Sequence, residues 1–145
     1  MGIVGRDGER LEDKFADGPR TYLGLMMHKF PNLFLVTGPQ SPPSVLYNMP
    51  LAIEDHVDFV TDAIAHLRQR GLDTIEPTRE AEDAWVAHCA ALAEATLMPD
   101  TDSWYMGANI PGKPRACMVY LAEHPPTGRS APTWSTAATR LRTRR

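Results

Sequence analysis

The strongest strand signal in the chain is the run Leu33-Phe34-Leu35-Val36-Thr37, which is followed at once by Gly38-Pro39. Its residues show no polar alternation, and a short apolar run bounded by turn residues is typical of a strand buried on both faces. Strands of that kind lie inside parallel sheets whose two sides are covered by helices. The run therefore predicts an α/β fold in which residues 33–37 form a buried parallel strand.

A first amphipathic helix is predicted after this strand. Pro50 suits the first helical turn, Asn48 or Met49 lies near the cap, and Gly71 ends the helix. Apolar residues recur along it at alternating intervals of four and three: Ile53, Val57, Val60, Ile64 and Leu67. That spacing places them along one face.

A second amphipathic helix is predicted from its cap, Thr78, to about Leu97. One of its faces carries Ala81, Trp85, Cys89, Leu92 and Thr96. An irregular stretch follows, and residues 116–121 (Ala-Cys-Met-Val-Tyr-Leu) predict a final strand.

Charge divides the 145 residues into two parts. Residues 1–121 carry a net charge of −7, whereas residues 122–145 carry +4 and consist largely of Pro, Thr, Ser, Ala and Arg. We expect residues 1–121 to be the folded part and residues 122–145 to be a disordered basic tail, because the tail has almost no aliphatic side chain to bury. The acidic part argues against nucleic acid as a partner, since phosphate binding requires clustered Lys and Arg.

The sequence also excludes several other classes of protein. It contains no apolar run of about 18 residues, so no membrane span or membrane partner is predicted, and it does not begin with a secretory signal. Cys89 and Cys117 form no C-x-x-C motif, so a cytoplasmic protein is expected. His56 and His66 face different directions on the first helix, and no metal site is predicted from the five histidines.

Two features suggest ligand binding. The path from strand through Gly38-Pro39 to a helix start offers unpaired N–H groups to an electron-rich ligand, unless it is an ordinary βα turn. The stretch 103–115 holds Trp104 and Tyr105 among Gly and Pro, so it either covers a ligand or is a surface loop anchored by its rings. The chain has no G-x-G-x-x-G and no G-x-x-x-x-G-K-[ST], so the usual pyrophosphate loop is missing and no catalytic residue is assigned.

Several blocks of sequence stand in a fixed order between about residues 3 and 121. They are Gly18-Pro19-Arg20-Thr21-Tyr22-Leu23-Gly24-Leu25, Phe30-Pro31-Asn32-Leu33-Phe34, Thr37-Gly38-Pro39, Asn48-Met49, Ile53-Glu54-x-His56-Val57, Glu82-Asp83-x-Trp85-Val86-x-His88 and Ser103-Trp104-Tyr105-x-Gly107-Ala108-Asn109-Ile110-Pro111-Gly112-Lys113-Pro114-Arg115. In order and spacing they resemble the C-terminal third of type I Baeyer–Villiger monooxygenases. So many ordered matches are more specific than one short motif.

The resemblance implies a flavoprotein with two dinucleotide-binding domains, of which this chain is the C-terminal piece. In that family NADPH reduces FAD, the reduced flavin reacts with O2, and one oxygen atom is inserted beside a ketone carbonyl to give an ester or lactone. The resemblance places Asn48 and Met49 against the pyrimidine edge of the flavin and Trp104 on a mobile loop over the nicotinamide and substrate. Ser44, Val45 and Leu46 then fall in the loop that lines the substrate pocket.

The chain departs from the family pattern at three places. Pro42-Pro43 adds one residue to the usual loop, and Lys29 stands where a glycine is typical. After Leu121 the family continues with glycine and aromatic residues, whereas this chain changes to Pro, Thr and Arg. The change looks like translation in a shifted frame or a degraded gene end. The absence of a family-like continuation in another frame of the DNA beyond codon 121 would refute the shifted frame.

The sequence thus predicts a fragment, inactive alone, of a ketone-oxidising monooxygenase that depends on FAD and NADPH. Its expected partners are a small ketone or heteroatom substrate and the missing N-terminal portion. Two alternatives stay open: a related flavin monooxygenase that oxidises sulfur or nitrogen, and a small non-catalytic domain that binds a partner through its two helices.

Overall fold

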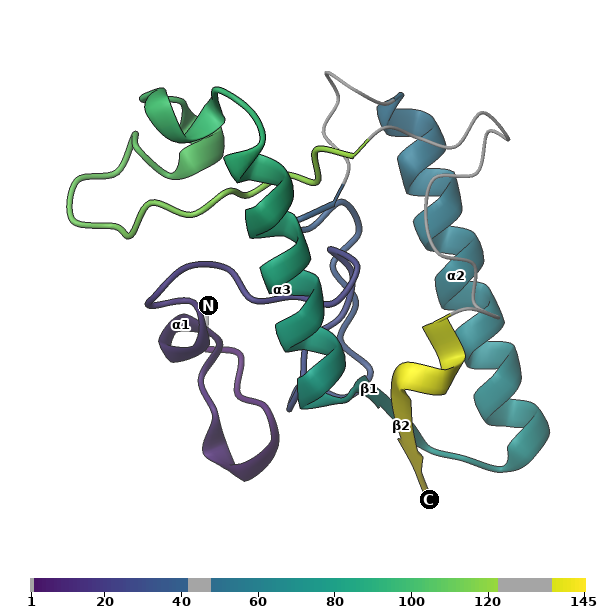
Figure 1. The fold of residues 1–145 in the computed structure, drawn as a ribbon. Coiled ribbons are helices and arrows are strands. Elements are labelled where there is room, and N and C mark those ends of the chain that lie inside the picture. Colours follow the sequence, from purple (N-terminus) through teal and green to yellow (C-terminus); the bar gives the residue numbers. More distant parts are fainter. Residues whose placement is uncertain (1, 42–47, 123–136) are drawn as a thin grey trace.

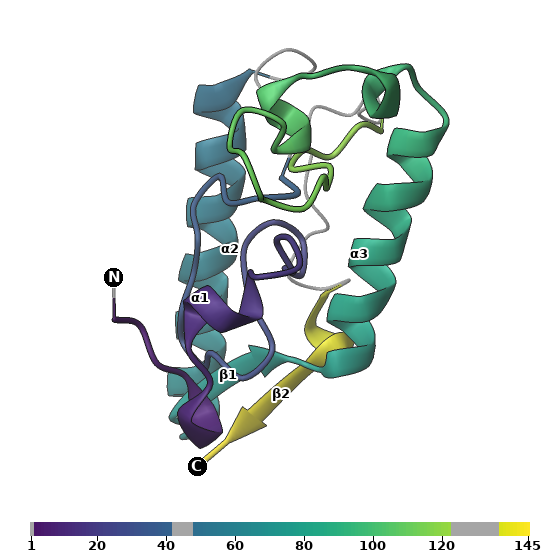
Figure 2. The same cartoon turned by 90° about the vertical axis from the view of Figure 1, so that its left-hand side faces the viewer.

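The structure of the chain is a computed structural model that describes residues 2–41, 48–122 and 137–145. Two long helices, α2 (Met49–Arg70) and α3 (Arg79–Glu94), stand on either side of the N-terminal segment (Figures 1 and 2). A two-stranded sheet of β1 (Thr74–Pro77) and β2 (Leu141–Arg144) lies at one end of these helices. The other elements are single turns: α1 (Leu11–Lys14) and the 3-10 helices η1 (Arg6–Gly8), η2 (Met98–Asp100), η3 (Trp104–Met106) and η4 (Ala138–Arg140). None of the helices in these ranges is long and apolar enough to cross a membrane.

Helix α2 begins and ends where its sequence signals predict. The Asn48 side chain caps it by accepting the N–H of Leu51 at 3.3 Å, and Pro50 lies in the first turn. Gly71 ends it in the left-handed conformation, with φ of 59°. These local predictions are confirmed.

The buried face of α2 differs from the predicted apolar face. The side chains turned into the protein are Ala52, His56, Phe59 and Ala63, with Val60 and Leu67 packed beside them. The other three residues of the predicted face, Ile53, Val57 and Ile64, are 40%, 49% and 43% exposed. The helix therefore carries an apolar surface that the described residues leave half uncovered.

Helix α3 is capped by Thr78, whose hydroxyl accepts the N–H of Ala81 at 3.2 Å, as predicted. It ends at Glu94, three residues before the predicted end at Leu97. Its buried side chains are Ala81, Glu82, Cys89 and Ala93.

The predicted strand at Leu33–Thr37 is not formed. The segment makes no strand pairing within the described residues, Val36 is 46% exposed, and Thr37 has a φ of 53°. One backbone hydrogen bond resembles those of a sheet: the Leu35 N–H donates to the Leu25 carbonyl at 2.8 Å. Residues 35–38 instead form a turn, in which the Gly38 N–H donates to the Leu35 carbonyl at 3.2 Å, so the extended backbone ends before a ladder with a second strand can form.

The predicted final strand at 116–121 is reduced to one parallel bridge between Ser41 and Val119. Two backbone bonds flank it, from the Gln40 N–H to Met118 at 2.7 Å and from the Tyr120 N–H to Ser41 at 2.9 Å. The pairing fixes the chain at Ser41, immediately before the segment that leads to α2.

The C-terminal residues 137–145 are ordered, which corrects the predicted disorder for that part of the tail. β2 pairs antiparallel with β1, from Thr74 opposite Arg144 to Pro77 opposite Leu141. Exposure alternates along β2, with Leu141 half-buried and both arginines of the strand exposed. The tail has too few aliphatic residues for its sequence to predict this strand. The strand forms because β1 supplies its hydrogen-bonding partner. Residues 123–136 lie outside the described part.

Two buried glutamates tie the N-terminal segment to β1 and α3. Glu76 accepts the Lys29 N–H at 3.0 Å and pairs with Arg6 at 2.8 Å. Glu82 accepts the His28 N–H and the Lys14 ammonium, both at 2.8 Å. Each carboxylate thus has a backbone donor and a cation, which compensates for its burial.

Lys29 has a φ of 69°, a backbone conformation that favours glycine. That conformation accounts for the glycine that the family pattern places at this position.

The larger hydrophobic core joins segments that are distant in the sequence. Phe59 and Ala63 of α2 meet Ile75 of β1 and Ala81 of α3, and the loop around residues 22–26 fills the space between them. A smaller core holds Ala93, Met106, Cys117 and Val119.

Asn32 forms hydrogen bonds with the backbone of β1, much as a neighbouring strand would. It adopts a φ of 58°, its N–H donates to the Ile75 carbonyl at 3.0 Å, and its side-chain oxygen accepts the Ile75 N–H at 3.0 Å. Its side-chain amide donates to the Asp73 carbonyl at 2.9 Å.

Replacing Asn32 by alanine should lower the free energy of unfolding by about 2–3 kcal/mol, because two side-chain hydrogen bonds are lost and alanine is strained at this φ. Asn32→Gly loses the same bonds without the strain, so it should be about 1 kcal/mol less destabilising. Urea unfolding measures both. A loss below about 0.5 kcal/mol for Asn32→Ala would show that these bonds do not stabilise the fold.

Candidate functional site

The start of α2 is the place where a flavin edge is predicted. Asn48 is exposed there and Met49 is half-buried. Pro50 has no N–H, the N–H of Leu51 is bound to the Asn48 side chain, and the N–H of Ala52 donates to the Asn48 carbonyl at 3.0 Å. Among the described residues, the Met49 N–H is therefore the donor at the start of the helix that has no hydrogen-bond partner. Such a donor, at the positive end of a 22-residue helix, suits a carbonyl or anionic ligand atom.

Ser44, Val45 and Leu46, the predicted pocket residues, lie outside the described residues. The positions on both sides of them are fixed. Ser41 donates its hydroxyl to the Gly38 carbonyl at 2.6 Å and pairs with Val119, and Asn48 caps α2.

Trp104 lies on η3, in a loop whose base is closed. The Ser103 hydroxyl caps η3 by accepting the Tyr105 N–H at 3.2 Å, and the Met118 N–H donates to the Tyr105 carbonyl at 2.8 Å. Arg115 pairs with Asp102 at 2.9 Å, so the loop is clamped at its two ends. The indole of Trp104 is 59% exposed, with its ring centre 4.0 Å from that of Tyr105. A large aromatic surface is thus presented to solvent on an anchored loop.

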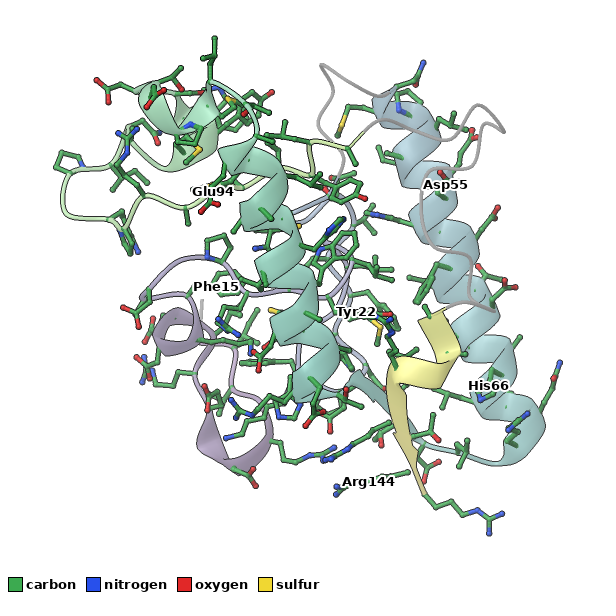
Figure 3. The ribbon with its side chains drawn as sticks, in the orientation of Figure 1. Phe15, Tyr22, Asp55, His66, Glu94 and Arg144 are labelled. Atoms are coloured by element: carbon green, nitrogen blue, oxygen red, sulfur yellow. The ribbon has the colours of Figure 1, made fainter. Side chains whose placement is uncertain are left out.

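Neither of two cavities is lined by a residue of α2. One of about 310 Å³ is lined by Arg20, Glu94 and Cys117, among others, and one of about 200 Å³ by Phe15 and other residues. Figure 3 shows Phe15 and Glu94 on the same side of α3. Asn48, Met49 and Trp104 line neither cavity, so the structure does not gather the predicted site residues into these pockets.

His56 has a positioning role that the sequence analysis did not assign. It is 2% exposed, and its Nδ1 accepts the Thr37 N–H at 2.9 Å, which ties residues 33–38 to the first half of α2. Because Nδ1 accepts, the neutral ring carries its proton on Nε2. Burial lowers the pKa of His56, and the nearby Asp55 opposes this shift. The sequence signal for this role is the helical spacing of His56 with Ala52, Phe59 and Ala63, which places all four on one face of α2.

Most of the chain is similar to flavin monooxygenases. It is 44% identical over 82% of its length to the acetone monooxygenase (methyl acetate-forming) of Gordonia sp. strain TY-5. A Baeyer–Villiger monooxygenase of Pseudooceanicola batsensis is 43% identical over 84% of the chain. The chain belongs to the Baeyer–Villiger monooxygenase family. It is a fragment in extent, since it spans 22% of the length of each of these two relatives.

Solved members of the Baeyer–Villiger family share the fold of the chain. A cyclohexanone monooxygenase from Rhodococcus sp. Phi1 bound to NADP+ matches 99% of this chain with a TM-score of 0.85 and 33% identity, and the match covers 27% of that enzyme. The phenazine N-monooxygenase PhzNO1 of Lysobacter antibioticus is 41% identical over 83% of the chain. No family model matches the sequence.

The pKa direction at His56 predicts how stability depends on pH. The folded form binds fewer protons than the unfolded form between the lowered pKa and the ordinary value of about 6.5. Stability should therefore be constant above about pH 6.5 and fall as the pH decreases below it. Thermal unfolding between pH 5 and pH 8 measures this slope, at roughly half-unit steps.

His56→Asn keeps an acceptor that does not titrate, so it should flatten the acid decline. The same change at His66, the other histidine of α2, serves as the control and should leave the decline in place. An unchanged slope in His56→Asn would show that His56 is not the group responsible.

Proposed function

We propose that the chain is the part of a Baeyer–Villiger monooxygenase that flanks the flavin and covers the substrate. The complete enzyme converts a ketone into an ester or lactone with NADPH and O2. The observation that carries this proposal is the 43–44% identity, across more than four fifths of the chain, to enzymes with that activity in their names.

FAD, reduced by NADPH, supplies the activated oxygen in such an enzyme. The residues described here fit one edge of the cofactor: Asn48 is exposed at the helix start, and the Met49 amide is available as a donor. The sequence has no glycine-rich pyrophosphate loop, so FAD and NADP are held by the absent portion and the chain alone is inactive. Trp104, with its exposed indole, covers the nicotinamide and substrate, and Ser44, Val45 and Leu46 line the pocket.

Oxidation at nitrogen is the second candidate. It is favoured by the 41% identity to a phenazine N-monooxygenase over 83% of the chain, which is close to the identity to the ketone-oxidising relatives.

A chimera tests the function. Residues 3–121 replace the matching segment of the Gordonia acetone monooxygenase, and the unaltered enzyme serves as reference. The chimera should bind FAD and form methyl acetate from acetone with consumption of NADPH, whereas the 145-residue chain alone should bind no FAD. A chimera that folds with FAD and oxidises phenazine but no ketone would favour N-oxygenation, and one that oxidises neither would contradict the proposed function.

Two variants of the chimera separate the role of Trp104 from general loop stability. Trp104→Ala should lower kcat/KM by roughly tenfold or more, since it removes the aromatic cover. Ile110→Ala removes another exposed apolar side chain of the same loop, which is 49% exposed, and should have little effect. Equal losses in both would contradict a specific role for Trp104.

A further inference from the structure

The outer strand of the small sheet is rich in arginine. Arg142 and Arg144 of β2 are both exposed, and they lie on one face of the strand because residues two apart point to the same side. Arg140, directly before the strand, and Arg145, directly after it, are exposed as well. Figure 3 shows Arg144 at the end of the molecule, below both long helices. None of these four arginines forms a salt bridge with another of the residues that the structure describes.

The acids near these arginines balance only part of their charge. Asp73 is exposed and lies beside Arg144, to whose carbonyl its N–H donates at 2.9 Å. Glu80 is exposed at the start of α3, and its pKa is lowered by hydrogen bonds with its own N–H and with Thr78, and further by the charge of Arg142. The four arginines outnumber these two acids, so the strand carries an excess of positive charge.

The strand β2 also has backbone groups that no other strand satisfies. The Arg140 carbonyl accepts the Thr78 N–H at 3.1 Å, so Arg140 and the residues two and four positions further on direct their peptide groups toward β1. The peptide groups of Leu141 and Thr143 therefore point to the opposite edge. The Leu141 N–H turns back to the Ala138 carbonyl at the end of η4. Among the described residues this leaves the Leu141 carbonyl and both backbone groups of Thr143 without a hydrogen-bond partner, and we name the edge that holds them the β2 edge.

The arginines decide which chain can pair with the β2 edge. Two copies of the chain joined through β2 would place arginine opposite arginine, and like charges directly opposite each other are destabilising. A partner strand with carboxylates at alternate positions would instead place an acid opposite each arginine. Its intervening residues would lie beside Leu141 and Thr143, which are half-buried, so apolar β-branched side chains suit those positions. A nucleic acid would match the arginines alone, since it has no strand backbone to pair with the free groups.

We propose that the β2 edge binds an extended peptide segment in which Glu or Asp alternates with apolar residues. The segment lies beside β2 as a third strand of the sheet, where its backbone hydrogen bonds provide affinity and the arginines select the acids. This binding does not depend on the proposed function.

A synthetic peptide tests the binding to the purified 145-residue chain. The probe is Thr-Glu-Val-Glu-Val-Glu-Thr, blocked at both ends and labelled with fluorescein. Its fluorescence anisotropy should rise to saturation as the chain is added, and the binding should weaken as the salt concentration is raised. The control peptide has lysine in place of each glutamate and should not bind. Failure of the glutamate peptide to bind, or equal binding of both peptides, would overturn the proposal.

N-methylation of the same peptide tests the strand geometry. With glutamates opposite Arg142 and Arg144, the N–H groups of the valines face β2, whereas those of the glutamates face away. Methyl groups on both valine nitrogens should therefore abolish binding, and methyl groups on the glutamate nitrogens should leave it nearly unchanged. Equal effects of the two modifications, or equally tight binding of a single-stranded oligonucleotide, would show that the arginines attract any polyanion and would overturn strand addition.

Charge reversal provides matched variants of the chain. Arg142→Glu and Arg144→Glu should each weaken peptide binding by roughly fivefold or more, since an attractive cross-strand pair becomes a repulsive one. Lys113→Glu makes the same change at an exposed residue of the loop 103–115, which lies at the other end of the molecule from β2 (Figures 1 and 2), and should have little effect. Circular dichroism of the three variants checks that each keeps the fold of the parent chain. Equal binding by all three would contradict the role of the arginines.

Discussion

The hydrogen-bonding requirement of one extended segment governs the arrangement of this chain. Residues 33–37 have the composition of an interior strand, but among the described residues they pair with no other strand. The Leu35 N–H donates to the Leu25 carbonyl, and the peptide groups of Phe34 and Val36 have no hydrogen-bond partner there. Water can satisfy such groups, and the segment ends in a turn, where the Gly38 N–H donates to the Leu35 carbonyl at 3.2 Å, instead of continuing as a strand. Its place is fixed instead by a side chain, through the bond from Thr37 to His56. The same contact ties this segment to the first half of α2.

Local signals were sufficient for the elements whose stabilising contacts are local. Asn48, Gly71 and Thr78 set the ends of α2 and the start of α3 by capping, and each could be identified from the sequence. The predicted apolar face of α2 lies to one side of the face that is buried. The buried face has a weak hydrophobic signal, because Ala52 and Ala63 are small and His56 is polar.

Elements that depend on distant partners could not be predicted in the same way. β2 has one aliphatic residue, Leu141, and exists because β1 offers a free edge at one end of the two helices. Residues 33–37 show the opposite failure: the sequence encodes a strand whose neighbours are absent from the described chain. The roles of Asn48, Met49 and Trp104 came from family resemblance, and the structure adds an available amide and an exposed indole without joining them in one pocket.

Amide hydrogen exchange of the chain tests the account of residues 33–37 most directly. The amide of Leu35, which donates to Leu25, and that of Ile75, which donates to Asn32, should exchange slowly. The amides of Phe34 and Val36 should exchange at nearly the rate of an unfolded peptide. Slow exchange at Phe34 and Val36, equal to that at Leu35, would show that these two N–H groups are already hydrogen-bonded within the chain and would contradict the account.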